Sequence, residues 1–474
     1  YLILVWLTGL AAFGLPLYAY IHTRDTLHPL LFLGPMLAFV YWLTPVVLVA
    51  DGAIWSLLPR SQMAFVQGFY LLGVLSLGLG VLAAGKPSRW RTRPFVPSNR
   101  LRRQLRTSGL LLGGIGAAAF LYGIDFVGGF ESAYGDAYGG GWAASGYVRE
   151  AFYWIIPGLL LLLLANSGRK MAPQDVLLIV LVSAPMLVHG LLGARRGPMA
   201  LILITLFAGW YLIRYRRPSL PQLGAALAVI GLGLLILITH RNMISLNSDF
   251  EFQGTEVFTD YVGRASGGNE YVLGSGLIID TARSGEHQWG ARWVIKSVVR
   301  VVPRQLWPSQ YQDAYRFFGV EGVEVNQVAN FEESLGWNAT GGAGIALLAE
   351  FWWQLWWLSL PALFAVGWLY GRAWYGAVET GGLWILIYVV LLALSVFLVA
   401  QGMGAMLFRL LWLGGAGWFV WQLFVRRAFR QQQRAQRRAR WSAALPGRAG
   451  APPAVQPGSR GPHWRPPPAT PQRL

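Results

Sequence analysis

Long, uninterrupted apolar segments constrain this chain more than any other feature. The segments PGLLLLLLAN (157–166) and ILIYVVLLALSVFLVA (385–400) are solidly apolar, whereas the strands of a membrane β-barrel alternate apolar and polar residues. A helix satisfies its own backbone hydrogen bonds inside a bilayer, so these segments favour helices. Because 55% of the 474 residues are hydrophobic and the mean hydropathy is +0.44, we predict an all-α polytopic membrane protein embedded in a lipid bilayer.

Apolar windows of about 20 residues, the length that crosses a bilayer, predict about eleven transmembrane helices. Eight of them precede a long stretch that lacks such windows, and three follow it. The predicted helices lie near residues 1–21, 29–50, 63–85, 108–129, 151–166, 176–193, 198–213, 221–240, 355–371, 383–401 and 405–425.

Basic clusters between these segments predict their orientation. The linker 86–106, after the third segment, carries eight basic residues and no acidic one, which places it in the cytoplasm by the positive-inside rule. Alternation from this linker puts the basic segments 167–170 and 214–218 and the tail from Arg426 on the same side. The same alternation puts 241–350 on the outer face of the membrane.

The chain therefore divides into four predicted regions. These are an N-terminal transmembrane bundle (1–240), a large extracytoplasmic loop domain (241–350), C-terminal transmembrane helices (351–425) and a basic cytoplasmic tail (426–474). A loop as long as the second region is usually functional. The tail is rich in Pro, Gly and Arg and has little to bury, so we expect most of it to be disordered.

Composition and missing motifs exclude several classes of function. The formal net charge of +18 does not indicate nucleic acid, because the basic residues cluster beside apolar segments, where they set topology. The absence of cysteine excludes disulfides and thiolate metal sites. The sequence has no Walker, Rossmann or HExxH motif, and Asp51 stands alone in the first outer loop, without the acidic pair of a metal-dependent glycosyltransferase. We therefore expect no metal and no cofactor.

Two adjacent arginines, Arg195 and Arg196, interrupt the apolar sequence VHGLLGARRGPMALILI (188–204). Pro198 is typical of a first helical turn, so the N-terminus of a helix points at this place. Its N–H groups, its dipole and two guanidiniums form an anion site suited to phosphate or diphosphate. Since adjacent helical residues diverge by about 100°, we expect one arginine to face a cavity and the other the headgroups. The alternative is that both only set topology.

Other ionisable residues are predicted at the same depth as this pair. Charge within a membrane span is costly and usually faces a protein-lined cavity, so each is a candidate for function or for a structural ion pair. These residues are Asp125, His189, His240, Arg241 and Arg409.

The loop domain offers further cations beside aromatic rings. IKSVVRVV (295–302) has the pattern of an amphipathic surface helix that Pro303 ends, so that a turn presents Arg304 and Trp307. Trp307 then suits either an interfacial anchor or a platform for the C–H face of a sugar. Asp260 and Arg264 are additional candidates for substrate contact.

Glu350 is isolated in the apolar sequence GIALLAEFWWQLWW (344–357). Burial raises the pKa of a carboxyl group, which suits a general base or acid near neutral pH. Glu350 is therefore either a proton acceptor or the buried partner of one of the arginines, and the sequence leaves both open.

Three short segments in this order resemble the oligosaccharide repeat unit polymerases, the O-antigen polymerase family. They are GARRGPMALILITLFAGWYLIRYRRP (193–218), VPRQLWP (302–308) and GGAGIALLAEFWW (341–353). The resemblance covers roughly 110–425 in topology. Two departures affect where donor contacts are placed: Ser309-Gln310 replaces a lysine after LWP, and FWWQLWWLSL replaces a glycine-rich continuation after Glu350.

The resemblance implies a metal-independent glycosyltransferase in the bacterial cytoplasmic membrane, with its site on the outer face. Its substrates would be polyprenyl-diphosphate-linked oligosaccharides, and it allows a chain-length regulator protein as a further partner. Arg195, Arg196 and Arg304 would hold the departing diphosphate. Glu350, or else His189 or Asp260, would deprotonate the acceptor. The predicted substrate contacts are His189, Arg241, Asp260, Arg264, Trp307 and Arg409.

Three other functions fit the same sequence. An O-antigen ligase has the same donor but transfers a finished polymer to another acceptor. A transporter of the lipid-linked sugar would carry charged residues along its whole path, whereas the predicted ones cluster at one face. A non-catalytic envelope assembly protein would not need Arg195 or Arg304 for polymer synthesis.

Overall fold

The computed structural model describes residues 1–50, 52–85, 95–136, 146–240, 244–247, 269–303, 305–320, 330–331, 335–338 and 344–443. The chain forms two compact units, Tyr1–Ala428 and Phe429–Leu474. The first unit contains all the described candidate residues and nine of the ten membrane-spanning candidates; the tenth, Met403–Ala435, crosses the boundary between the units. The predicted division of this unit at 240 and 350 stays a prediction, and the tail from 444 lies outside the described residues.

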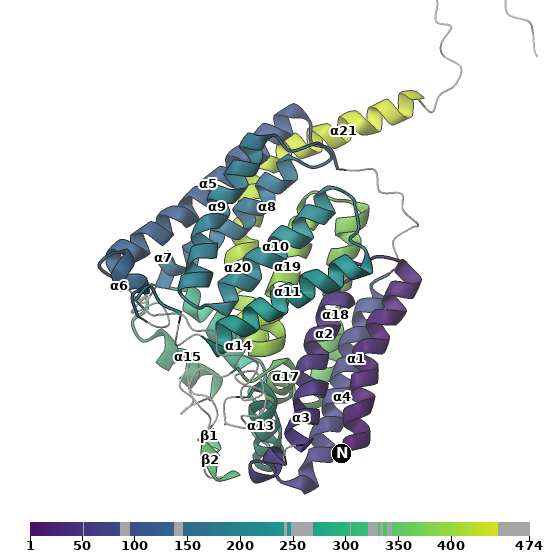
Figure 1. The fold of residues 1–474 in the computed structure, drawn as a ribbon, viewed down its shortest axis with the longest axis vertical. Helices are drawn as coiled ribbons and strands as arrows, with labels where there is room; N and C mark the ends of the chain where they lie inside the picture. Colours follow the sequence, from purple (N-terminus) through teal and green to yellow (C-terminus); the bar gives the residue numbers. More distant parts are fainter. Residues whose placement is uncertain are drawn as a thin grey trace, which may run out of the picture. The chain divides into compact units, whose positions relative to one another are not determined.

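The described residues are almost entirely helical (Figure 1). The elements are α1 (Leu2–Thr23), α2 (Leu30–Ala38), η1 (Phe39–Leu43), α3 (Thr44–Ala50), η2 (Ala53–Ser56), α4 (Arg60–Ala83), α5 (Asn99–Phe126), α6 (Phe130–Tyr134), α7 (Gly146–Ala151), η3 (Phe152–Trp154), α8 (Ile155–Ala165), α9 (Pro173–Leu192), α10 (Arg196–Ile213), α11 (Leu220–Thr239), α13 (Glu270–Ser284), α14 (Ala291–Ser297), η4 (Val299–Val301), α15 (Gln310–Phe318), β1 (Asn330–Phe331), β2 (Trp337–Asn338), α17 (Leu347–Leu355), η5 (Trp356–Leu358), α18 (Ser359–Glu379), α19 (Leu383–Gln401), α20 (Met403–Val420), η6 (Trp421–Val425) and α21 (Arg426–Ala443).

Ten helices among the described residues are long and apolar enough to cross a membrane, which confirms the prediction of a helical polytopic membrane protein. They are α1, α2 to α3, α4, α5, α7 to α8, α9, α10, α11, α19 and the helix that begins with α20. The remaining predicted segment, 355–371, overlaps α18. This helix has 21 residues, but Arg372 and several Trp and Tyr side chains make it less apolar than the other ten.

Glycines let α18 pack closely along α4. A Cβ added to Gly80 would lie 2.0 Å from the carbonyl oxygen of Phe364, and one added to Gly367 would lie 2.0 Å from that of Leu77. Small residues that allow such backbone approach are typical of helix pairs in membranes. The helix α18 also contacts α19, which in turn packs against α10 and α20. The helix therefore belongs to the bundle although its composition is less apolar.

Buried polar contacts tie several connecting segments together at one end of the helices, which we call the Asp25 end. Arg217 Nε lies 2.6 Å from Asp25 Oδ1, and Trp374 Nε1 donates a hydrogen bond to Asp25 Oδ2 at 3.0 Å. The Tyr388 hydroxyl donates to the backbone carbonyl of Leu27. These contacts join the α1–α2 and α10–α11 connections to α18 and α19.

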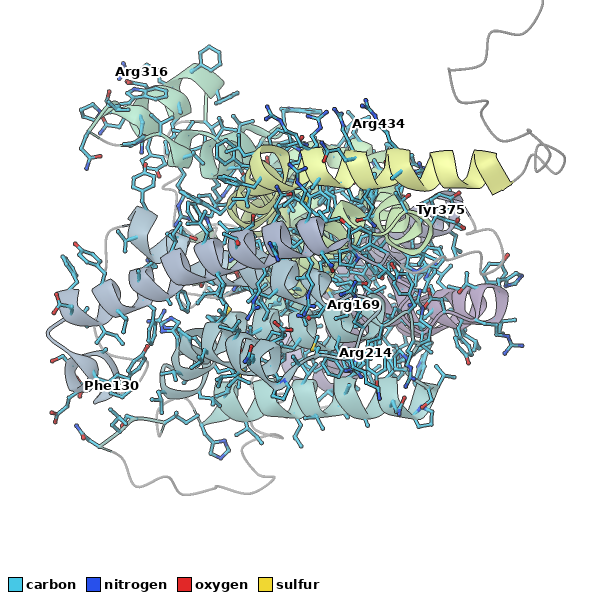
Figure 2. The ribbon with its side chains drawn as sticks, turned by 90° about the horizontal axis from the view of Figure 1, so that it is seen from above. Phe130, Arg169, Arg214, Arg316, Tyr375 and Arg434 are labelled. Atoms are coloured by element: carbon cyan, nitrogen blue, oxygen red, sulfur yellow. The ribbon has the colours of Figure 1, made fainter. Side chains whose placement is uncertain are left out.

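The α8–α9 connection belongs to the same end. Gly168 N–H donates a hydrogen bond to the carbonyl of Ile213 at 3.3 Å. Arg169 and Arg214, which follow these two residues in the chain, are labelled in Figure 2. Arg102, at the start of α5, is 2.9 Å from the buried carboxylate of Asp175 at the start of α9. Three of the segments predicted to share one side of the membrane therefore lie at one end of the helices, as far as the structure describes them: 95–106, 167–170 and 214–218.

The opposite ends of the helices meet the described parts of 241–350, and we call this the Arg195 end. The Tyr1 and Tyr271 hydroxyls are 2.7 Å apart, and Trp337 Nε1 donates to the carbonyl of Leu57 at 2.9 Å. The helix α13 is buried along most of its length. Short antiparallel strands β1 and β2 pair Phe331 with Trp337.

The helix α14 differs from the surface helix predicted at 295–302. It begins earlier, at Ala291, and its Arg292, Ile295 and Ser297 are buried. A single 3-10 turn follows and ends before Pro303, where the proline was expected to stop the helix. The cause of the difference is packing, because α14 lies against the first turns of α20.

Candidate anion-binding site

The connection between α9 and α10 places Arg195 at a helix N-terminus. The backbone reverses at Ala194, which has a positive φ of 45°, and Arg195 is the N-cap residue of α10. Its N–H donates to the carbonyl of Gly190 at 3.0 Å, which fixes the turn. Pro198 falls within the first helical turn, as its sequence position predicted.

Arginines from four separate segments converge near this turn, and we call Arg149, Arg195, Arg300 and Arg409 the arginine cluster. Arg149 and Arg300 each lie 3.6 Å from the same oxygen, Oε1 of Glu150. Arg195 interacts electrostatically with Arg149, and Arg409 interacts electrostatically with Arg149, Arg300 and Glu150. With one carboxylate, Glu150, among four guanidiniums, the cluster has an excess of positive charge among the described residues.

Aromatic rings and backbone groups hold these arginines in place. The Cζ atom of Arg300 lies 4.2 Å from the centre of the Phe408 ring, and that of Arg409 lies 4.0 Å from the Phe397 ring. Arg409 Nη1 donates to the carbonyl of Ala405 at 3.0 Å, while its buried Nε has no hydrogen-bond partner within the described residues. A buried N–H group without a partner can donate a hydrogen bond to an acceptor atom of a bound ligand.

The arginine cluster is suited to bind an anion. Burial lowers the pKa of Arg195, with nearby Arg149 acting in the same direction, so an anion at this place would offset both desolvation and repulsion. An arginine guanidinium keeps its charge in proteins, so Arg195 remains a cation. Planar guanidiniums bind phosphate oxygens through paired hydrogen bonds, and the N-terminus of α10 adds its dipole.

His189 lies beside the arginine cluster, on the last turn of α9. Its side chain is 3% exposed, and its Nδ1 is hydrogen-bonded to the Tyr134 hydroxyl at 3.0 Å. The Phe152 ring lies 5.2 Å away, and Arg195 interacts with the imidazole electrostatically. The structure therefore brings together three of the predicted residues, His189, Arg195 and Arg409.

Arg196 points away from the arginine cluster, toward α13. Its Nη1 lies 3.5 Å from Oε1 of Glu270, the first residue of that helix. The expected divergence of Arg195 and Arg196 is therefore present. The second arginine, however, has a protein carboxylate beside it, a contact that the sequence did not predict.

Glu350 lies in a separate buried group of charges. Gly404 N–H is 3.3 Å from both carboxylate oxygens, and Lys296 and Arg292 of α14 interact with the carboxylate electrostatically. Burial raises the pKa of Glu350, whereas Lys296, the Gly404 N–H and Arg292 act in the opposite direction. Burial, helped by Arg292 and Arg300, lowers the pKa of Lys296 from 10.5 to about 8.

Trp307 is partly buried, and both uses predicted for it, as an anchor or as a platform, stay predictions. It packs with Tyr311 and Tyr315 against a small core of Ile295, Val299 and Ala314. Its Nε1 donates to Asp313 Oδ2 at 2.7 Å, which holds the ring against α15.

No known protein family, curated protein or solved structure matches the chain. The geometry of its own residues therefore has to support any function. In the part of the chain that the structure describes, no three His, Asp or Glu side chains are grouped so as to hold a metal ion. Four predicted site residues lie outside the described residues: Arg241, Asp260, Arg264 and Arg304.

Sequence reasoning missed several charged residues of these two groups. A usable signal existed in α14 and η4, where Arg292, Lys296 and Arg300 recur every four residues and so share one helical face. Arg149 and Glu150 gave no such signal, because nothing in the sequence relates the start of the fifth apolar segment to η4.

Proposed function

We propose that the chain is a membrane-embedded, metal-independent glycosyltransferase that joins polyprenyl-diphosphate-linked oligosaccharide repeat units into a cell-surface polysaccharide. The observation that carries the proposal is the arginine cluster, in which guanidiniums from four segments interact with one another and Glu150 lies beside Arg149 and Arg300. The sequence resemblance to oligosaccharide repeat unit polymerases supports the substrate class.

A diphosphate leaving group matches the charge of this cluster. In the proposed reaction the acceptor hydroxyl attacks the anomeric carbon of the donor, and the bond from that carbon to the diphosphate oxygen breaks. The diphosphate leaves with the electron pair, and developing charge of this kind is stabilised by preorganised cations. Arg195 and Arg409 are the cations we place nearest the leaving oxygens, because both are largely buried beside Tyr153.

The proton of the acceptor hydroxyl needs an acceptor near the same place. We assign this role to His189 on its position, because its imidazole lies beside the arginine cluster and its orientation is fixed by Tyr134, and a bound diphosphate would offset the repulsion between Arg195 and an imidazolium. Glu350 is less suited, since its carboxylate is covered by the start of α20.

Aromatic side chains beside the cluster suit the sugar or the lipid part of the donor. Trp412, one turn beyond Arg409 on α20, lies 6.2 Å from Tyr147 and 6.1 Å from Trp154, measured between ring centres. Tyr and Trp offer flat apolar faces together with a polar edge, which suits sugar C–H groups.

We further propose that the Arg195 end faces the outside of the bacterial cytoplasmic membrane. The support is charge distribution: the basic residues in 95–106, 167–170 and 214–218 belong to the other end. The diphosphate-linked donor would then be used after it has crossed the membrane.

Purified protein in lipid vesicles tests this function. It is given a polyprenyl-diphosphate-linked repeat unit without nucleotide or divalent metal, and the products are resolved by size. We expect a ladder that Arg195→Ala reduces by about 10²-fold or more, because one preorganised donor to a developing charge is worth that much. Arg214→Gln is the matched control, since Arg214 is exposed at the opposite end of α10.

Two results would contradict the polymerase, and a third would contradict its proposed site. Transfer of the sugar to a different acceptor in a single addition would identify a ligase, and movement of the lipid-linked unit across the vesicle membrane without a new glycosidic bond would identify a transporter. A ladder unchanged by Arg195→Ala would remove the arginine cluster from the reaction.

A further inference from the structure

We propose that Glu350 is a positioning residue that anchors the start of α20 and thereby sets the place of Arg409 and Arg300 in the arginine cluster. This inference rests on the proposed function. It chooses between the two roles that the sequence left open for this carboxylate, and it is argued from the packing around it.

The carboxylate of Glu350 fills a slot that two glycines form at the start of α20. A Cβ added to Gly402 would lie 2.1 Å from Oε2, and one added to Gly404 would lie 3.0 Å from Oε1. Gly402 also has a positive φ of 89°, which other residues adopt only with strain. With the side chain 3% exposed, backbone rather than substrate occupies the space in front of the carboxylate.

The carboxylate of Glu350 in this slot lies at the N-terminus of α20. Glu350 accepts the N–H of Gly404, one of the first N–H groups that an α-helix leaves without an internal partner. An anion at a helix N-terminus is stabilised further by the helix dipole. Glu350 therefore caps α20 from a different helix, α17.

The same carboxylate balances cations of α14. The Cβ position built on Gly404 is 3.5 Å from Lys296 Cδ, which places the lysine side chain beside the slot. Lys296 and Arg292 are both largely buried, and each interacts electrostatically with the Glu350 carboxylate. A buried cation without such an acid is costly.

Glu350 is connected to the arginine cluster through both helices that it holds. One turn beyond Gly404, Phe408 lies under the guanidinium of Arg300, and Arg409 follows on the same helix. One turn beyond Lys296, η4 carries Arg300. A shift of α20 against α14 would therefore move two of the four arginines relative to each other.

A double-mutant cycle distinguishes positioning from proton transfer. Glu350→Gln, Lys296→Met and the double variant are compared in vesicles by melting temperature, inorganic pyrophosphate binding, and kcat and KM for the lipid-linked donor. We expect Glu350→Gln to raise the donor KM and the pyrophosphate Kd about 10-fold and to lower the melting temperature, because it leaves Lys296 unbalanced. The double variant should recover most of each loss.

A kcat that stays low in the double variant while its melting temperature recovers would show that Glu350 is the proton acceptor and overturn the inference. Additive effects of the two substitutions on the melting temperature would also overturn it. Wild-type protein that binds pyrophosphate but forms no product would instead contradict the proposed function alone. The coupling between Glu350 and Lys296 would still be measurable in the melting temperature and in the pyrophosphate Kd.

The glycine slot gives an independent test of the same inference. Gly402→Ala should displace the carboxylate and raise the donor KM in the same way as Glu350→Gln. Gly415→Ala on the same helix is the control, because nothing lies within 4 Å of a Cβ at that position. An unchanged KM in Gly402→Ala would show that the slot does not position the cluster.

Discussion

Lys296 is the residue whose surroundings predict a measurable dependence on pH. Burial first, and then Arg292, disfavour its ammonium form, so its pKa in the folded protein is about 8 instead of 10.5. Between these two values the folded chain has lost a proton that the unfolded chain still holds. Unfolding then takes up a proton, and the contribution of Lys296 to stability rises with pH across this window.

We therefore expect the melting temperature of the wild type, minus that of Lys296→Met, to increase from about pH 8 to about pH 10.5. Lys170→Met is the control, because Lys170 is exposed at the Asp25 end. Tryptophan fluorescence during heating, at a series of pH values, measures the difference. A difference that is flat or that falls over this range would contradict the burial of Lys296.

Individual residues were predicted unevenly from the sequence. Arg195 was predicted because proline and adjacent cations mark a helix N-terminus, which is a local signal. The contact of Arg196 with Glu270 was not predicted, because Glu270 lies 74 positions later in the chain. The Gly402–Glu350 contact had no signal either, since it is made by two segments that only the fold brings together.

At the scale of elements, α17 stands out because its two flanking residues are both strained. Ala346 has a φ of 62° with a ψ of 156°, and Trp356 has a φ of 50° with a ψ of −135°. These are regions that residues other than glycine rarely occupy, at a cost of about 1–3 kcal/mol each. The strained residues therefore lie at both ends of the short helix that carries Glu350.

Ala346→Gly should therefore raise the melting temperature, because relief of strain exceeds the extra entropy of glycine in the unfolded chain, about 0.4–1 kcal/mol. Ala349→Gly, three residues later inside α17, should lower it, because glycine in a helix interior is unfavourable by about 0.5–1 kcal/mol. Thermal unfolding of both variants measures the pair. The same sign for both would show that Ala346 is not strained.

Elements with strong apolar patterns were predicted well, and elements fixed by packing were not. The predicted segments 29–50 and 383–401 agree closely with α2 to α3 and with α19. By contrast, α5 begins at Asn99, about two turns before the predicted 108, because an amphipathic basic turn continues the helix without adding hydrophobicity. The helix α14 was misjudged because its partner, α20, is distant in sequence.

At the scale of the whole molecule, the chain has no cysteine, which allows its orientation to be tested directly. Arg169 at the Asp25 end and Gln305 in the predicted outer loop are both exposed. In intact cells whose outer barrier is permeabilised, a maleimide that cannot cross membranes should label Gln305→Cys. It should label Arg169→Cys only after the cytoplasmic membrane is opened. Labelling in the reverse order would invert the proposed orientation.

The slot around Glu350 also limits how this chain can vary over evolutionary time. A side chain at 402 or 404 would crowd an acid at 350, so glycine at both positions leaves the space that the carboxylate occupies. A relative that loses the acid becomes free to gain a side chain at 404, whereas the positive φ at 402 still favours glycine there. We therefore expect positions 350 and 404 to change together, which makes this pair a more selective mark of descent than the apolar segments, where many residues are interchangeable.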